Sequence, residues 1–196
     1  MRVSKKIGLY FGTFNPIHVG HLTIANYMVE FSDLDEVWLV VTPHNPHKKK
    51  NSLLDDVHRL TMVRIAVEDY PKLKTSSIEF DLPQPNYTVN TLAHLEEKYP
   101  EYNFCLIMGE DNLKSFHKWK NYEVILERYS IYVYPRISEG RTESRFIDHP
   151  AITLVEAPIM ELSSTFIRNA IKKNKNIRPM LPDAVWKYLD EMNFYR

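Results

Sequence analysis

The chain has 196 residues, with 25 Lys plus Arg against 25 Asp plus Glu, so its formal net charge is zero. This length suits one domain with a substantial core, and the balanced charge argues against a general nucleic-acid-binding protein. No segment approaches the roughly 20 apolar residues of a membrane span or the pattern of a signal peptide. The lone cysteine, Cys105, cannot form an internal disulfide, and we expect it to be a buried core residue. We therefore expect a cytoplasmic protein that binds neither nucleic acid nor membranes.

Short apolar runs alternate with helical patterns along the chain. The runs predict strands at 7–11, 37–41, 77–80, 104–108, 130–134 and 152–155. The patterns between and after them predict helices at about 19–31, 55–70, 89–99, 122–128, 164–172 and 183–192. This alternation predicts an α/β fold, a Rossmann-like doubly wound and mostly parallel sheet with helices on both faces. We expect a single domain over residues 1–196, with the helices from about residue 163 packed on it.

Polar segments follow four of the predicted strands. Ligands of open parallel sheets bind beyond the carboxyl ends of the strands. The segments after the first, second, fourth and sixth strands are therefore expected to meet at one rim of the sheet; they are residues 12–21, 42–50, 109–119 and 162–168.

The segment after the first strand carries the most specific chemistry. Gly12 lets the backbone turn tightly or approach a ligand. His18 and His21 lie three residues apart where a helix begins, so they can share one face. Free amides at a helix N-terminus bind anions, and two imidazoles there can donate hydrogen bonds to phosphate oxygens. Two histidines without a third ligand nearby make a poor zinc site, so a phosphate site is the favoured interpretation.

Several common motifs are absent from the sequence. It contains no Gly-x-Gly-x-x-Gly and no Gly-x-x-x-x-Gly-Lys-Ser/Thr, which weakens the usual dinucleotide-binding and P-loop interpretations. It also contains no Gly-x-Ser-x-Gly, which argues against an α/β-hydrolase.

Residues 12–22, Gly-Thr-Phe-Asn-Pro-Ile-His-Val-Gly-His-Leu, resemble the loop of the nucleotidyltransferase superfamily with its His-x-Gly-His motif. Within that superfamily the chain is most similar to the bacterial nicotinate-nucleotide adenylyltransferases. The resemblance covers nearly the whole chain, and further segments support it: Pro43–Lys48, Arg59–Met62, Asn86–Leu92, Gly109–Leu113 followed by Trp119, and Leu162–Arg168.

The resemblance implies an enzyme that transfers the adenylyl group of ATP to nicotinate mononucleotide, with Mg²⁺ brought by ATP and no dedicated metal site. The residues implied to act in catalysis are His18, His21, Lys48 and Arg168. Those implied to bind ATP are Gly12, Thr13, Phe14, His18, His21, Gly109, Asp111, Ser164, Thr165 and Arg168. Those implied to bind the pyridine mononucleotide are Asn15, Lys48, Tyr87, Thr88, Trp119 and Arg136.

Some of these residues also have a purely structural interpretation. Thr88 is a candidate helix cap, and by the resemblance it is part of the backbone that faces the pyridine carboxylate. Ser164 or Thr165 is expected to cap a helix, with Arg168 one turn further in and able to fork onto phosphate oxygens. Arg59 lies within an amphipathic helix and is expected to be mainly structural. The polar surroundings of Trp119 favour an aromatic platform over a core position.

The chain departs from the family pattern in two places. Residues 82–86, Leu-Pro-Gln-Pro-Asn, stand where an Arg-Gly-Gly-type turn and a serine are common, which leaves the path of this loop open. Pro135 and Arg136 reverse the family's usual Arg-Pro order.

Two alternatives remain at this stage. A pantetheine-phosphate adenylyltransferase shares the fold and the His-x-Gly-His loop, and a non-catalytic nucleotide-binding regulatory module would share the ATP site. The sequence leaves open the choice between nicotinate and nicotinamide, and the oligomeric state.

Overall fold

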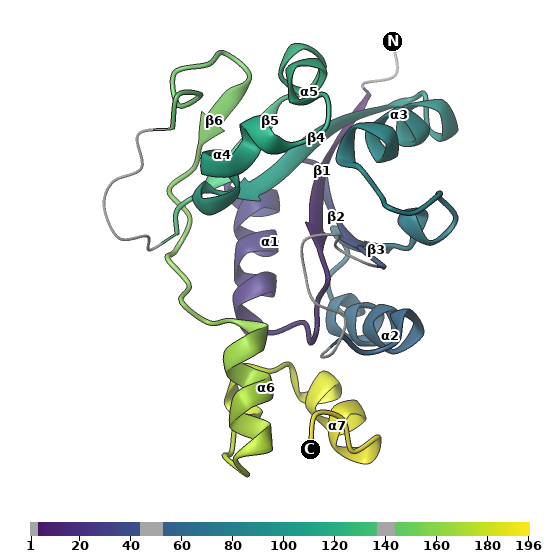
Figure 1. The fold of residues 1–196 in the computed structure, drawn as a ribbon, viewed down its shortest axis with the longest axis vertical. Helices are drawn as coiled ribbons and strands as arrows, with labels where there is room; N and C mark the ends of the chain where they lie inside the picture. Colours follow the sequence, from purple (N-terminus) through teal and green to yellow (C-terminus); the bar gives the residue numbers. More distant parts are fainter. Residues whose placement is uncertain (1–3, 44–52, 137–143) are drawn as a thin grey trace.

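The computed structural model describes residues 4–43, 53–136 and 144–196 (Figure 1). Its described strands form one parallel sheet. In chain order they are β1 (Lys5–Gly12), β2 (Glu36–Val41), β3 (Leu73–Ser76), β4 (Tyr102–Gly109), β5 (Ile131–Tyr134) and β6 (Ile152–Leu154). The order across the sheet is β3-β2-β1-β4-β5-β6, with every neighbouring pair parallel. This is the order of the doubly wound Rossmann fold, which confirms the predicted fold class.

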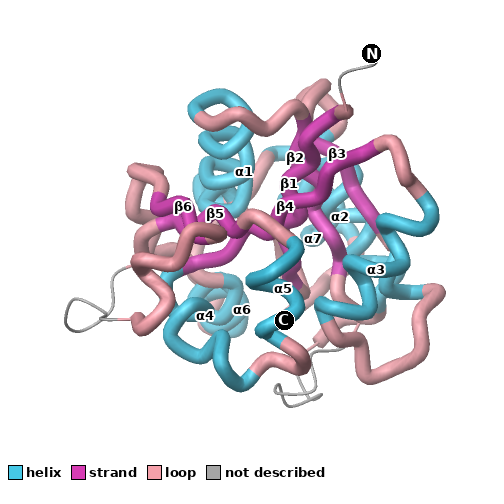
Figure 2. The backbone as a smooth tube through the Cα atoms, turned by 90° about the horizontal axis from the view of Figure 1, so that it is seen from above, coloured by secondary structure: helices cyan, strands magenta, loops and turns pink. Residues whose placement is uncertain are grey.

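The helices cover both faces of the sheet. Those longer than one turn are α1 (Val19–Phe31), α2 (Asp56–Val67), α3 (Thr88–Lys98), α4 (Glu110–Ser115), α5 (Tyr122–Arg128), α6 (Ser164–Lys172) and α7 (Asp183–Glu191). Buried residues of α1, α2, α6 and α7 share one hydrophobic cluster, and those of α3, α4 and α5 share the other. Figure 2 shows α1 on one side of the sheet and α3, α4 and α5 on the opposite side. The sheet therefore separates two cores, and a site at its edge can draw residues from both.

The carboxyl end of β1 marks the rim where the predicted site segments meet. In Figure 1, α6 and α7 lie beyond this end of the sheet, next to the start of α1. Helix α7 packs on α2, and Ile167 of α6 and Val185 of α7 are both completely buried in the first cluster. The last two helices thus form one side of the rim and do not cover β6.

The predicted strand at 77–80 is wrong. Strand β3 lies just before it, pairing from Val37↔Leu73 to Val40↔Ser76, and residues Ile78–Phe80 form a 3₁₀ turn. The run was misleading because Ile78 is buried in a turn, whereas β3 is a mostly polar edge strand in which Leu73 alone is fully buried. Helix α4 was not predicted, because its only buried residue is Leu113 and it has no apolar period.

Cys105 is 1% exposed in the middle of β4, which confirms the predicted core position. Burial raises the pKa of its thiol to about 11, so the group is un-ionised at neutral pH. Among the described residues, no helix is both long enough and apolar enough to cross a membrane.

Candidate active site

The loop between β1 and α1 is tightly folded. Phe14 adopts a left-handed backbone conformation with φ 45°, and the Asn15–Pro16 peptide bond is cis. A Cβ atom on Gly12 would lie 2.8 Å from the Phe14 ring, so a glycine is needed for this ring to fold back under the end of β1. Helix α1 then starts at Val19, as predicted, with His18 at its N-cap position. The loop therefore delivers both histidines to the N-terminus of a helix.

His18 and His21 stack on each other at this helix start. Their ring centroids are 3.7 Å apart, with 22° between the ring planes. The backbone N–H of His18 donates to Nδ1 of His21 at 3.3 Å, so a neutral His21 carries its proton on Nε2. Nδ1 of His18 is buried and has no hydrogen-bond partner among the described residues. A Cβ atom on Gly20 would lie 3.1 Å from that nitrogen, which explains the glycine between the histidines.

His18 is held neutral by its surroundings. Its side chain is nearly inaccessible, with 3% of the residue exposed. Burial, together with the nearby positive charge of Arg136, lowers the pKa of His18 to about 4 from its ordinary value of 6.5. The inner member of the pair is therefore an uncharged imidazole at neutral pH, and it can contact a phosphate only through a neutral N–H group or after taking up a proton.

This lowered pKa predicts a pH-dependent contribution to stability. The unfolded chain binds a proton at His18 near pH 6.5, whereas the folded chain does so only near pH 4. The contribution is therefore present above pH 6.5 and is lost as the pH falls towards 4. The free energy of unfolding of the unchanged protein should therefore fall between pH 7 and pH 4.5. In His18→Asn this fall is expected to be smaller by about 2 kcal/mol.

Urea titrations at the two pH values measure this difference, and the exposed His117→Asn variant is the control. Equal losses of stability in His18→Asn and the unchanged protein would show that His18 is not buried in its neutral form.

A small pocket adjoins the histidine pair. Its enclosed volume is about 10 Å³, room for about one water molecule. The residues that line it come from α1, from the carboxyl ends of β1 and β5, and from the segment before α6: Tyr10, His18, Gly20, His21, Ile24, Tyr134, Arg136, Met160 and Leu162. Sequence reasoning missed Tyr10 and Tyr134, whose hydroxyl oxygens lie 3.3 Å apart. Their position near the ends of parallel strands was the available signal.

Arg136 links this pocket to the segment after β4. Its Nε lies 3.9 Å from Oδ1 of Asp111, and its backbone N–H donates to Oε2 of Glu110 at 3.3 Å. Gly109 makes the close approach possible, since a Cβ atom there would lie 2.5 Å from Asp111 Oδ1 and 3.1 Å from Arg136 Cγ. Gly109 and Asp111 from one predicted segment and Arg136 from another are thus neighbours on the His18 side of the rim.

The start of α6 is bound to the β1–α1 loop. Ser164 Oγ donates to the Pro16 carbonyl at 2.9 Å, and Arg168 Nη1 donates to the Asn15 carbonyl at 2.7 Å. Arg168 Nη2 also donates to Oγ1 of Thr165 at 3.1 Å.

The prediction that Ser164 or Thr165 caps α6 is wrong. The cap is Ser163, whose Oγ accepts from the Phe166 backbone N–H at 3.2 Å. Ser164 is instead the first helical residue, and its hydroxyl is engaged by the loop.

The elements predicted to bind the pyridine ring lie side by side on the other face of the sheet. Tyr87 occupies the N-cap position of α3 and Thr88 is its first residue, so the prediction of Thr88 as a cap is wrong. The Lys120 ammonium lies 4.4 Å from the centre of the Tyr87 ring. Its neighbour Trp119 is half-buried, with its ring centroid 5.3 Å from that of Phe116. The segments around residues 87 and 119 therefore meet.

A buried acid fixes the loop whose path the sequence left open. Glu79 is 2% exposed, and its Oε1 accepts from the Thr91 hydroxyl at 2.8 Å. Its backbone carbonyl accepts from Asn86 Nδ2 at 3.0 Å. Between them the chain turns through a cis Gln84–Pro85 peptide bond. Burial raises the pKa of the Glu79 carboxyl above its ordinary value. Asn86, which replaces the family's serine, thus anchors the segment that leads into Tyr87.

Arg59 is completely buried behind the rim. Its guanidinium donates to four backbone carbonyls and pairs with the carboxylate of Asp56. The carbonyls belong to Thr13 at 2.7 Å, Thr42 at 2.8 Å, Pro43 at 2.8 Å and Leu54 at 3.0 Å. This network supports the structural interpretation of Arg59, because its donors hold together the loops that follow β1 and β2.

Lys48, predicted to hold phosphate, lies outside the described residues, as do its neighbours between 44 and 52. Within the described ranges, no group of three His, Cys, Asp or Glu side chains is arranged to hold a metal ion.

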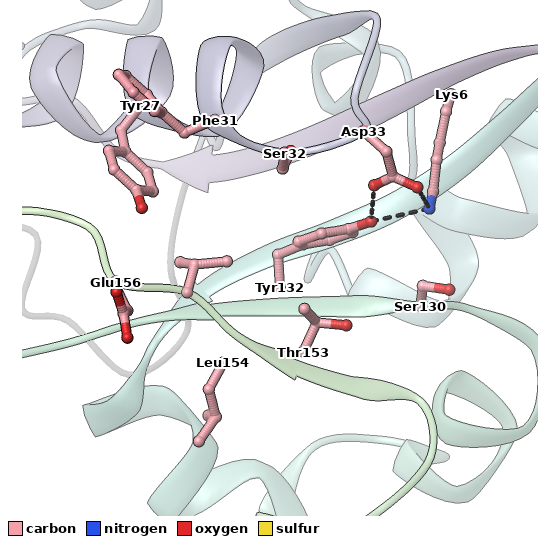
Figure 3. Close-up of a pocket in the computed structure, with 11 residues that line it drawn as sticks. Lys6, Tyr27, Phe31, Ser32, Asp33, Ser130, Tyr132, Thr153, Leu154 and Glu156 are labelled. Atoms are coloured by element: carbon pink, nitrogen blue, oxygen red, sulfur yellow. Dashed lines mark hydrogen bonds and ion pairs between the residues drawn. The ribbon is translucent and has the colours of Figure 1, made fainter.

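A larger cavity lies away from this rim, beside the end of α1 and the starts of β1 and β5 (Figure 3). Its volume is about 510 Å³. Lys6 donates to Asp33 at 2.7 Å and to the Tyr132 hydroxyl at 2.8 Å, and the Tyr132 hydroxyl donates to Asp33. These polar groups satisfy one another, whereas the smaller pocket at the rim contains an imidazole nitrogen that has no partner in the described part of the chain. The rim is therefore the better candidate for the active site.

Comparisons with known proteins show the family to which the chain belongs. The profile of the cytidylyltransferase-like family matches residues 9–170, and the chain belongs to this family. Its curated relatives include a probable nicotinate-nucleotide adenylyltransferase of Christiangramia forsetii, 69% identical over 99% of this chain and 100% of the relative. Another protein of that name, from Flavobacterium psychrophilum, is 67% identical over 97% of this chain and 99% of the relative. The suspected resemblance is thereby confirmed.

Solved structures show the same fold. A Plasmodium falciparum nicotinic acid mononucleotide adenylyltransferase complexed with NaAD superposes with a TM-score of 0.82 at 20% identity, covering 97% of both chains. A putative nicotinate-nucleotide adenylyltransferase from Vibrio parahaemolyticus gives a TM-score of 0.72 at 25% identity, covering 98% of this chain and 96% of the other.

Proposed function

We propose that this protein transfers the adenylyl group of ATP to nicotinate mononucleotide, yielding nicotinate adenine dinucleotide and pyrophosphate. The observation that carries the proposal is the stacked pair His18 and His21 at the N-terminus of α1, next to the charge of Arg136. This arrangement is suited to a polyphosphate. The choice of acceptor is supported by the names of full-length relatives at up to 69% identity and by the meeting of the Tyr87 and Trp119 segments.

The reaction needs positioning more than covalent catalysis. An oxygen of the mononucleotide phosphate forms a bond to the α-phosphorus of ATP while the bond from that phosphorus to the bridging oxygen breaks. The electron pair of the broken bond leaves with pyrophosphate. The attacking phosphate is already an anion, so no strong general base is required. The chain's contribution is then to hold both substrates in line and to stabilise the charge that builds up on the α-phosphate.

His21 is proposed to stabilise that charge, because its Nε2–H can donate to an α-phosphate oxygen. His18 is proposed to support the His21 ring by stacking against it as an uncharged imidazole. We also propose that Arg168 and Lys48 hold the polyphosphate. The remaining ATP contacts are proposed for the loop after β1, the segment after β4 and the start of α6, namely Gly12, Thr13, Phe14, Gly109, Asp111, Ser164 and Thr165.

Mg²⁺ is proposed to arrive with ATP. Such ions usually keep several of their waters and bind through substrate phosphates.

The acceptor is proposed to bind between the Tyr87 and Trp119 segments, with Asn15, Lys48, Thr88 and Arg136 contributing polar contacts. Trp119→Ala is expected to raise the KM for nicotinate mononucleotide by about tenfold, since stacking of a base on an aromatic ring contributes about 1–3 kcal/mol. The KM for ATP is expected to change little. Steady-state kinetics with each substrate varied measure both constants.

A matched control is Trp186→Ala, because Trp186 is also half-buried but lies on α7. An unchanged KM for the mononucleotide in Trp119→Ala would remove Trp119 from the acceptor site.

Release of pyrophosphate from ATP tests the proposed function directly. We expect release with nicotinate mononucleotide at a kcat/KM well above that with nicotinamide mononucleotide, and none with pantetheine phosphate. Release with pantetheine phosphate alone would support the related adenylyltransferase instead. ATP binding without any release of pyrophosphate would support a regulatory module.

A further inference from the structure

The start of α3 is not fixed by a cap of its own. Tyr87 occupies the N-cap position, and its side chain makes no capping hydrogen bond to the first turn. Helices more often begin at Ser, Thr, Asp or Asn, whose short side chains accept from the amides of that turn. The body of α3 is fixed by Leu92 and Leu95, which are completely buried in the second hydrophobic cluster. The position of the first turn must therefore be determined by contacts with other parts of the chain.

Glu79 supplies two such contacts from the 3₁₀ turn that follows β3. Its carboxyl oxygen Oε1 accepts from the hydroxyl of Thr91, which lies in the first turn of α3, at 2.8 Å. Its backbone carbonyl accepts from Nδ2 of Asn86, the residue directly before the N-cap, at 3.0 Å. Tyr87 and Thr88 thus lie between two residues that are both held by Glu79.

The hydrogen bond between Glu79 and Thr91 is shielded from water. Thr91 is completely buried and Glu79 is 2% exposed, so water cannot replace either partner. The Thr91 hydroxyl has a single hydrogen atom, and the Tyr87 carbonyl, at 3.4 Å, is the more distant of its two acceptors. Burial of a carboxyl group costs stability that an apolar side chain would not cost. The contribution of this carboxyl is therefore to hold the start of α3.

We infer that Glu79 is a positioning residue of the acceptor site, which acts by holding the first turn of α3 where Tyr87 and Thr88 contact the mononucleotide. This inference rests on the proposed function, in which these two residues bind the acceptor. It adds to the site a buried acid that has no contact with the substrate itself.

Thr91→Val tests the inference because valine has nearly the same shape as threonine and no hydroxyl. Without the hydrogen bond the first turn can leave the binding position, and the apparent affinity for the acceptor falls with the fraction of molecules that retain it. We expect the KM for nicotinate mononucleotide to rise by about five- to tenfold, the usual effect of losing one hydrogen bond. The kcat is expected to change little, because saturating acceptor restores the position. The KM for ATP is also expected to change little, because other segments bind ATP.

Tyr132→Phe is the matched control. The Tyr132 hydroxyl also donates to a carboxylate, that of Asp33, in the cavity that lies away from the rim (Figure 3). A loss of stability alone would lower the urea midpoint and the active fraction in both variants. The KM for the mononucleotide in Tyr132→Phe is expected to equal that of the unchanged protein. Equal values of this KM in Thr91→Val and Tyr132→Phe would overturn the inference.

Variants of Glu79 separate the hydrogen bond from the charge. Glu79→Gln retains an oxygen that can accept from Thr91, so its KM for the mononucleotide is expected to stay within about twofold of the original. Glu79→Leu loses this acceptor and is expected to raise the KM as much as Thr91→Val does. An equal rise in Glu79→Gln and Glu79→Leu would show that the hydrogen bond is not the cause, and would overturn the inference.

A double-mutant cycle shows whether Glu79 acts through Thr91. In the Glu79→Leu background, Thr91→Val is expected to cause no further rise in the KM for the mononucleotide. Multiplicative effects of the two changes would overturn the inference. Absence of pyrophosphate release by the unchanged protein would instead overturn the proposed function, so the two failures are distinguishable.

Discussion

His21→Ala is expected to reduce turnover by a hundredfold or more, the usual cost of losing one donor that acts in the transition state. His21 is the outer ring of the stacked pair, and the hydrogen bond from the His18 backbone N–H to its Nδ1 leaves the proton on Nε2. Alanine removes that donor and retains the helical position. Single-turnover and steady-state measurements of pyrophosphate release give the loss.

The control for this variant is His94→Ala, because His94 is a half-buried histidine on α3 that is not part of the rim. The urea midpoint of His21→Ala is expected to stay close to that of the unchanged protein, so that the loss reports on chemistry. Turnover of His21→Ala near the level of the control would show that the imidazole has no role in the transition state.

Arg59→Met is expected to have the largest effect on stability. The guanidinium is completely buried, whereas its partner Asp56 is partly exposed, so the main loss comes from the backbone carbonyls. The four carbonyls that accept from Arg59 would lose this donor, and each buried acceptor left without a partner typically costs about 1–3 kcal/mol. We expect a loss of at least about 3 kcal/mol in the free energy of unfolding, measured by urea titration.

The matched control is Arg64→Met, which changes an exposed arginine on the same helix. Its effect is expected to stay within about 0.5 kcal/mol, as for most surface substitutions. Arg59→Met and Arg64→Met variants of equal stability would show that the buried guanidinium contributes nothing to holding the two loops.

The parts of the fold that were predictable from the sequence are those with strong local patterns. The continuous apolar runs of β1, β2 and β4 predict strands that are buried on both faces. The bounds of α1 and α5 also agree with the prediction. Strand β3 escaped detection because an edge strand is only partly covered, so Lys74 and Thr75 leave no apolar run. The pattern of apolar residues indicates which residues are buried. Secondary structure predicted from it is therefore wrong where a buried residue lies in a turn or a strand is mostly exposed.

The candidate site shows a similar division. Placing residues after parallel strands was enough to bring Gly12, His21 and Gly109 to one rim. The roles of individual hydroxyls were harder to predict, because Ser163, Ser164 and Thr165 are all suitable caps and the choice depends on the docking of α6 against Pro16. Local sequence cannot contain that information, since the deciding contact joins residues 148 positions apart.

Glu79 and Tyr195 illustrate the limit further. Neither residue belongs to a motif that indicates nucleotide chemistry. Glu79 is important through Thr91 and Asn86, and Tyr195 through Asn15, and both sets of contacts depend on tertiary structure. A search of the sequence for chemically reactive residues identifies the groups that face the substrate. It does not identify the groups that hold them in place.

The contacts around Asn15 also determine when the site can form during synthesis. Its partners Arg168 and Tyr195 are separated from it by 153 and 180 residues. Proteins emerge from the ribosome from the N-terminus at about 5–20 residues per second. The β1–α1 loop is therefore made early but acquires these partners roughly ten to forty seconds later. A nascent chain that has completed the sheet but not α6 would have both histidines and neither of these two partners of Asn15, so we expect the β1–α1 loop to reach its final conformation only after the C-terminal segments are made.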